Sequence, residues 1–186
     1  MHHTLKFYGK NRQLTLRLYM FFAGWTRIPL LGRLVRYVID AYADNMHRAF
    51  LLSPQEAREL VAIAGSVAAG PCDCRSVFKN CDNPTDNEIL LGPTRHILME
   101  AMPEKSREIT VAEAEKTLED SHKRGLIHTI IKCRGDFYAI CNCCSCCCVP
   151  LRLSKQYGIG KVLVRHKDII GEYRRYQESY HHEEDH

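Results

Sequence analysis

Apolar residues recur at helical spacing through residues 14–47, with basic residues between them. Pro29 interrupts this pattern, because a proline inside a helix removes a hydrogen bond and clashes with the preceding turn. The pattern therefore predicts two successive helices, one before Pro29 and one after it. The longest uncharged run, residues 18–26, is far shorter than the roughly 20 residues that a membrane-spanning helix needs, so we expect no spanning segment here.

Two capping boxes mark the starts of further helices. The first comprises residues 53–56, has a proline at the first helical position and predicts a helix that runs to about residue 64. The second comprises residues 110–113 and predicts a helix that ends near Gly125.

The segment after the second capped helix has the pattern of a β-hairpin. Residues 127–132 and 137–141 alternate in character and are rich in β-branched side chains, and a tight turn at 133–136 joins them. A helix followed by a hairpin resembles a winged-helix arrangement. We therefore predict an α+β, mainly helical fold with a small, winged-helix-like β-hairpin and a cysteine-rich metal-binding loop.

Weaker signals complete the prediction. Pro and Gly punctuation indicates a loop at residues 65–70, and the remaining patterns predict short helices at 86–91, 94–102, 151–157 and 169–180, and a short strand at 161–164. We expect three parts: an N-terminal amphipathic helical arm (1–50), a central domain that contains all ten cysteines (51–170) and a polar, disordered tail (171–186).

The cysteines narrow the range of possible functions more than any other residue type. The chain has ten cysteines, six of them in the eight residues 141–148. No hydrophobic core needs such a density of thiols, and adjacent cysteines can rarely form a disulfide with each other. Thiolates are soft ligands, so crowded thiols suit zinc, copper(I) or an iron–sulfur cluster. We therefore predict a metal site formed by Cys72, Cys74, Cys81, Cys141, Cys143, Cys144, Cys146, Cys147 and Cys148.

The spacing of the cysteines alone does not identify the metal. Residues 141–147 contain C-x2-C-x2-C, the start of the bacterial ferredoxin pattern, but Leu151 stands at the fourth ferredoxin position. Cys143 and Cys146 offer an equally good C-x2-C pair for zinc. Zinc sites usually use two well-separated pairs and leave no surplus thiols. The excess of cysteines therefore favours one or two 4Fe-4S clusters, with zinc as the alternative.

Three motifs occur in order along the chain: C-D-C-R at residues 72–75, G-L-I-H at 125–128 and I-C-N-C-C-S-C-C-C at 140–148. Together they resemble a family of prokaryotic 4Fe-4S cluster-binding, ferredoxin-like proteins, over about residues 52–170. The long cysteine motif is specific, whereas the other features alone are weak. The resemblance implies cluster binding and electron transfer.

The chain departs from this family pattern in two places. Family members often have a further cysteine where this chain has Asn87 or Glu88. A site formed by Cys72, Cys74 and Cys81 would therefore recruit Glu88, Cys133 or a loop cysteine as an extra ligand. The ferredoxin domain that follows in the family has no counterpart after residue 170. The resemblance then implies that electrons reach this chain from a separate redox partner protein.

Cluster potentials respond to local charge and to N–H bonds to sulfur, so Arg75, directly after Cys74, is our candidate for cluster tuning, with a structural salt bridge as the alternative. No Ser/His/Asp constellation, phosphate-binding glycine loop or pair of acid/base carboxylates stands out. We therefore expect an electron carrier or redox subunit rather than an enzyme. The alternative function is a zinc-bound or cluster-sensing winged-helix module that contacts protein or DNA.

The net charge does not indicate whether the protein binds nucleic acid. The formal value of +4 counts the cysteines as neutral, and cluster-bound thiolates would cancel it. Mixed charge along the second capped helix argues against DNA binding. The arm instead suggests contact with a membrane surface or a partner subunit, through Arg17, Arg27, Arg33, Arg36, Phe21, Phe22 and Trp25. Without an export signal, we expect a cytoplasmic protein, at most peripheral on the inner face of the membrane.

Overall fold

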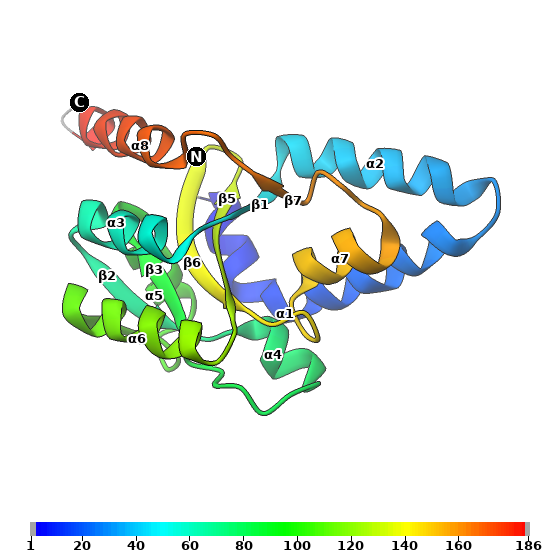
Figure 1. Cartoon of the computed structure of the whole chain (residues 1–186). Coiled ribbons are helices and arrows are strands. Elements are labelled where there is room, and N and C mark those ends of the chain that lie inside the picture. The colour runs from blue at the N-terminus through cyan, green and yellow to red at the C-terminus, as the bar shows by residue number, and fades with distance from the viewer. Residues whose placement is uncertain (1–2, 185–186) are drawn as a thin grey trace.

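The computed structural model describes residues 3–184, which form eight α-helices, two short 3-10 helices and one seven-stranded sheet (Figure 1). The helices are α1 (His3–Gly24), η1 (Trp25–Arg27), α2 (Leu31–Asn45), α3 (Pro54–Ala64), α4 (Asp73–Phe78), η2 (Gly92–Thr94), α5 (Arg95–Ala101), α6 (Val111–Lys123), α7 (Val149–Tyr157) and α8 (Ile169–Glu184). The strands are β1 (His47–Leu51), β2 (Val67–Gly70), β3 (Glu88–Leu91), β4 (Arg107–Ile109), β5 (Ile127–Cys133), β6 (Asp136–Cys143) and β7 (Leu163–Arg165).

The sheet has the strand order β4-β2-β3-β6-β5-β1-β7. Every neighbouring pair is antiparallel except β1 and β7, which run parallel. The predicted hairpin is present as β5 and β6 and follows α6, but both strands lie inside this larger sheet. The α+β class is therefore confirmed, and the β content is much larger than one hairpin.

Both faces of the sheet are buried, as the alternation of neighbouring strand residues shows. Ile130 and Ile140 lie in one core, beneath α3, α6 and α8, whereas Ile131 and Ala139 lie in the other, with α1 and α5 (Figure 1). Successive side chains of a strand point to opposite faces, so strands covered on both sides are apolar throughout.

Three segments differ from the sequence-based expectation. Strand β2 occupies the predicted loop at 65–70, strand β3 replaces the predicted helix at 86–91, and helix α8 covers most of the predicted disordered tail. Strands of four residues that are buried on both faces show no alternation, so periodicity could not identify them. Helix α8 is held by the fully buried Tyr173, whose ring lies 5.7 Å from that of Phe137.

The two N-terminal helices are present as predicted and form a hairpin whose far end projects from the rest of the molecule (Figure 1). The hairpin is joined to α7 and the following loop by a separate apolar cluster that includes Leu16, Ala43 and Leu153. Strand β1 follows α2 directly and pairs with β5 and β7, so the arm runs straight into the main sheet. Among the described residues, no helix combines the length and apolar character that crossing a bilayer requires.

The capping box of α6 predicts a measurable loss of stability on substitution. Thr110 accepts a hydrogen bond from the Glu113 backbone N–H at 3.1 Å, and Glu113 accepts one from the Thr110 N–H at 2.9 Å. Thr110→Ala should lower the free energy of unfolding by about 1 kcal/mol in chemical denaturation, because it leaves a helix-end donor unpaired. Thr117→Ala, which replaces a half-buried threonine in the middle of the same helix, should not lower the free energy of unfolding, since alanine favours helix. Equal losses for both variants would contradict this account of the cap.

Candidate metal centre

Nine of the ten cysteines lie together where β6 ends and α4 begins, and all ten are free thiols. They divide into two groups. The four-thiol group consists of Cys81, Cys144, Cys146 and Cys147, whose sulfur atoms all lie within 4.8 Å of one another. The five-thiol group consists of Cys72, Cys74, Cys141, Cys143 and Cys148, which line one cavity. Cys144 and Cys147 of the four-thiol group reach the same cavity, so the two groups adjoin there.

The four-thiol group can hold a metal ion. The Sγ of Cys81 lies 3.7 Å from that of Cys144 and 3.9 Å from that of Cys147, and Cys146 and Cys147 are also 3.9 Å apart. A tetrahedral ion with metal–sulfur bonds of about 2.3 Å requires sulfur atoms about 3.8 Å apart. These three distances match a tetrahedral tetrathiolate site, and all six sulfur–sulfur distances are within 4.8 Å.

Backbone geometry after α4 positions this group. Lys79 adopts a left-handed conformation (φ 50°) that ends the helix and turns the chain toward the thiols. The Asn80 N–H then donates to the Cys147 sulfur at 3.3 Å, and its side-chain amide donates to the Cys146 carbonyl at 2.8 Å. The Asn83 amide donates to the Cys81 sulfur at 3.6 Å. These donors would stabilise negative charge on metal-bound sulfur.

The five-thiol group surrounds a cavity of about 80 Å³. Cys143 is hydrogen-bonded to both Cys141 and Cys148, and Cys148 also contacts Cys74. Helices α1 and α2 close the cavity on the other side with aromatic and aliphatic side chains, including Tyr8, Leu16, Tyr19, Ile39 and Tyr42. The thiols therefore face a partly open, mostly apolar space.

Local backbone geometry, rather than sequence spacing, decides which loop cysteines belong together. Cys141 and Cys143 are two residues apart on β6, so both side chains point to one face of the strand. The chain then turns, with the Cys148 N–H donating to the Cys144 carbonyl at 3.1 Å. As a result Cys146 lies with the four-thiol group and not with Cys143. Neither the C-x2-C pair nor the C-x2-C-x2-C run considered from spacing forms one site.

Buried charges lie beside the five-thiol cavity. Arg12 of α1 bridges two carboxylates, with its Nη2 2.7 Å from Glu88 Oε1 and its Nε 3.2 Å from Asp73 Oδ2. Glu88 is 1 % exposed and accepts a hydrogen bond from the Cys141 sulfur at 3.4 Å. Its second oxygen, Oε2, has no hydrogen-bond partner among the described residues. Glu88 therefore stands next to the thiols, where the sequence suggested an extra ligand.

Arg75 is 1 % exposed and ties three segments together. Its Nη1 donates to the carbonyl of Pro84 and, at 3.0 Å, to Oδ1 of Asn87, while its Nη2 donates to the carbonyl of Asn142. The pKa of Arg75 is raised: burial lowers it, but the charges of Cys72, Cys144 and Cys143 outweigh that effect. The guanidinium is therefore a fixed positive charge between the two thiol groups.

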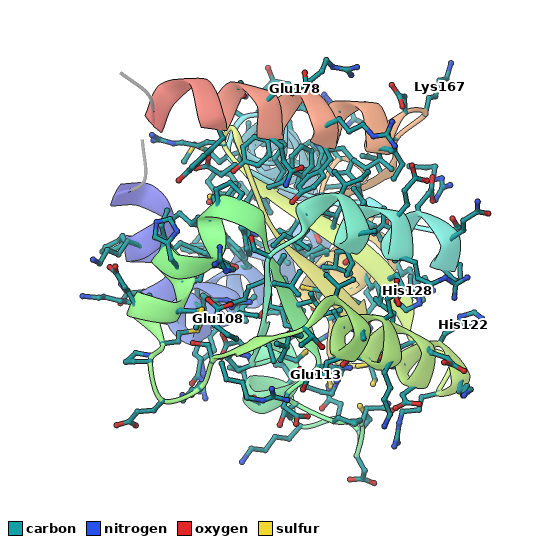
Figure 2. The ribbon with its side chains drawn as sticks, turned by 90° about the vertical axis from the view of Figure 1, so that its left-hand side faces the viewer. Glu108, Glu113, His122, His128, Lys167 and Glu178 are labelled. Carbon is teal, nitrogen blue, oxygen red and sulfur yellow. The ribbon has the colours of Figure 1, made fainter. Side chains whose placement is uncertain are left out.

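A second buried network holds the end of β6. His128 Nδ1 lies 2.6 Å from Asn142 Oδ1, and the Asn142 amide donates to the Asn87 carbonyl at 2.6 Å. His122 of α6 lies alongside His128, with ring centroids 5.9 Å apart (Figure 2). Burial lowers the pKa of His128, so the imidazole is neutral at physiological pH. The G-L-I-H motif thus supports the cysteine loop through its histidine.

The thiols differ in acidity. Burial alone would raise the pKa of Cys81, but hydrogen bonds from Asn83, Cys146 and Cys144 lower it to about 6. Burial and hydrogen bonds to Cys144 and Cys81 raise the pKa of Cys146 to about 12. In the five-thiol group, hydrogen bonds from Cys141 and Cys148 lower the pKa of Cys143. Each group therefore contains one thiolate that its neighbours stabilise.

The structure places eleven of the twelve predicted site residues at this end of the sheet. The exception is Cys133, which lies at the opposite end of the β5–β6 hairpin, paired with Asp136 and buried in an apolar core. It is separated from Cys143 by the length of β6, about 20 Å at 3.3 Å per residue. Sequence reasoning missed Arg12 and Asn80, which lie outside the three motifs, and it suggested the backbone amide of Asn142 for cluster tuning but not its side chain.

Comparison of the chain with protein-family models, with curated proteins and with solved structures found no match.

Removal of one sulfur from the four-thiol group should weaken metal binding strongly. Loss of a residue that merely supports a ligand costs about 10–100-fold in affinity, so Cys81→Ser should lower the affinity for Zn²⁺ at least about 100-fold in chelator competition. Cys133→Ser is the matched control, because Cys133 lies outside both groups. An unchanged affinity in Cys81→Ser would show that this group does not bind the ion.

Metal affinity should rise with pH. Cys146, with its pKa raised to about 12, and Cys147, whose pKa burial also raises, hold protons at neutral pH, and a metal must displace them. Each displaced proton contributes about tenfold in affinity per pH unit, so raising the pH by one unit near neutrality should strengthen Zn²⁺ binding. Competition titrations against a chelator of known pH dependence would measure this. A pH-independent affinity would be inconsistent with protonated ligands.

Proposed function

We propose that the protein is an iron–sulfur protein that carries single electrons for a partner oxidoreductase. The observation that supports this best is the five-thiol group with its cavity, because a single metal ion needs neither five thiols nor so much space. Three further features agree with the proposal: the buried Arg75, the N–H donors to sulfur and the partial exposure of the four-thiol group.

The size of the cavity favours a unit of several atoms. A volume of about 80 Å³ is several times the roughly 10–15 Å³ in which one water molecule can be held. Soft sulfur donors around such a space suit an inorganic cluster of iron and sulfide. Cys72, Cys74, Cys143 and Cys148 could supply four thiolates, with Cys141 or Glu88 as a replacement ligand.

The charges around the cavity also suit an anionic cluster. A 4Fe-4S centre in its oxidised state with four thiolates carries a net charge of about −2, which is costly to bury without compensation. Arg75 is buried between the two thiol groups and has no carboxylate partner among the described residues, whereas the buried Arg12 is neutralised by Asp73 and Glu88. The fixed positive charge of Arg75 would raise the reduction potential by stabilising the more negative, reduced state. Electron transfer is the chemistry that such a centre would supply.

A route for electrons to the surface would pass through the four-thiol group. Cys144 follows Cys143 directly, so the two groups are adjacent along the chain as well as in space. Cys81 and Cys146 are partly exposed, whereas Cys143 and Cys148 are buried. A redox partner that docks over Cys81 and Cys146 would therefore approach the centre more closely than one docked elsewhere.

A zinc-bound interaction module is the second candidate, and one observation favours it. The sulfur–sulfur distances of 3.7 to 3.9 Å in the four-thiol group match a single tetrahedral ion, as in structural zinc sites. The two candidates are compatible if zinc occupies the four-thiol group and a cluster the five-thiol group.

Anaerobic purification followed by iron, sulfide and zinc assays tests the proposal. The wild-type protein should be brown, with thiolate-to-iron absorbance that dithionite bleaches. Cys143→Ser should lose iron and sulfide together, whereas Cys133→Ser should keep both. Colourless wild-type protein that contains zinc and no sulfide would exclude the electron carrier and leave the zinc module. If Cys81→Ser loses only zinc, the two groups hold different metals.

A further inference from the structure

Exposed large apolar side chains are concentrated in one part of the molecule. Among the described residues, all of them lie between Phe7 and Tyr42, on α1, α2 and the connection between these helices. Several lie at the far end of the hairpin and are 37 to 98 % exposed: Phe21, Phe22, Trp25, Ile28, Leu30, Leu31 and Leu34. We call these seven residues the tip patch. Soluble proteins rarely expose such a contiguous patch unless something binds it.

The tip patch is held in a fixed conformation. The Arg36 Nη2 donates to the Thr26 carbonyl at 3.0 Å, and the Arg27 guanidinium lies 5.0 Å from the centre of the Tyr157 ring. Gly32 lies so close to Thr26 that an added Cβ would be 2.1 Å from the Thr26 carbonyl oxygen. The chain therefore needs glycine there to bring the connection and α2 together.

Leu30 differs from the other residues of the patch in its backbone conformation and its exposure. It adopts φ 67°, a conformation that is strained for leucine, and its side chain is 98 % exposed. Backbone strain in a non-glycine residue persists only where the surroundings impose it, and it is enriched at binding sites. Here the strained backbone holds an apolar side chain out into solvent.

The charge of the hairpin indicates what the tip patch binds. Residues 1–45 contain seven Lys or Arg and two acidic residues, Asp40 and Asp44, which lie toward the end of α2 away from the tip. The exposed Arg17 and Arg33 have no ion-pair partner among the described residues. Apolar and aromatic side chains interleaved with unpaired cations are typical of segments that lie in the interface of an anionic membrane.

We propose that the hairpin of α1 and α2 binds the surface of an anionic lipid bilayer, with the tip patch inserted among the headgroups and acyl chains. The exposed arginines contact lipid phosphates, and no helix crosses the membrane. A contact between protein chains is the alternative that the experiments below exclude. This proposal is independent of the metal that the thiols hold.

The single tryptophan provides a direct readout, because Trp25 belongs to the tip patch. We expect the full-length protein to co-sediment with vesicles of phosphatidylcholine and phosphatidylserine, and not with phosphatidylcholine alone. Binding should shift Trp25 emission to shorter wavelengths and reduce its quenching by iodide. Absence of binding to the anionic vesicles would overturn the proposal.

Two sets of variants test which features are needed. Leu30→Asp with Leu34→Asp should abolish vesicle binding, whereas Phe7→Asp, equally exposed but near the start of α1, should leave it unchanged. Each cation near an anionic surface contributes about 1 kcal/mol, so Arg17→Gln with Arg33→Gln should weaken binding about 25-fold. All substituted positions are exposed, and circular dichroism of each variant would test whether it folds. If Leu30→Asp with Leu34→Asp instead dissolves a dimer and leaves vesicle binding intact, the patch is a contact between copies of the chain.

Discussion

The buried guanidinium of Arg75 is the interaction on which the metal centre depends. It donates to the Pro84 carbonyl and the Asn87 side chain on one segment and to the Asn142 carbonyl, which lies more than 50 residues further along the chain. Removing a buried donor leaves its acceptors unpaired, at a cost of about 1–3 kcal/mol for each group. Together with the hydrogen bonds of Asn80 and Asn142, this bridge joins the loop that carries Cys81 to the end of β6.

The two thiol groups differ because two backbone conformations meet at the end of β6. Extended backbone directs Cys141 and Cys143 to one face, toward the cavity, and the turn that follows brings Cys144, Cys146 and Cys147 together with Cys81. The first environment has space, burial and fixed positive charge. The second has close sulfur atoms, N–H donors and partial exposure. A short, cysteine-rich segment can therefore supply two chemically distinct sites.

Helix α1 connects the metal centre with the hairpin tip. Its buried side contributes Tyr8, Arg12 and Leu16 to the wall of the cavity, and its far end carries aromatic residues of the tip patch. A helix is rigid over this length, about 33 Å for 22 residues. The proposed membrane contact would consequently hold the cavity at a fixed position relative to the bilayer, where a membrane-bound redox partner could reach it.

Local sequence determined the capped starts of α3 and α6, the β5–β6 hairpin and the thiol chemistry, because caps, alternation and ligand type depend on neighbouring residues. It did not identify β1, β2, β3 and β4, whose pairing partners lie elsewhere in the chain. It predicted the helix at 169–180 but not its extension to residue 184, in a segment that was expected to be disordered. It also did not indicate which thiols belong together. Cys81 lies 63 residues from Cys144, and Arg12 lies 76 residues from Glu88, so only the tertiary structure could bring them into contact. Spacing along the chain predicts contacts within one element, whereas contacts between elements depend on how the whole sheet and its helices pack.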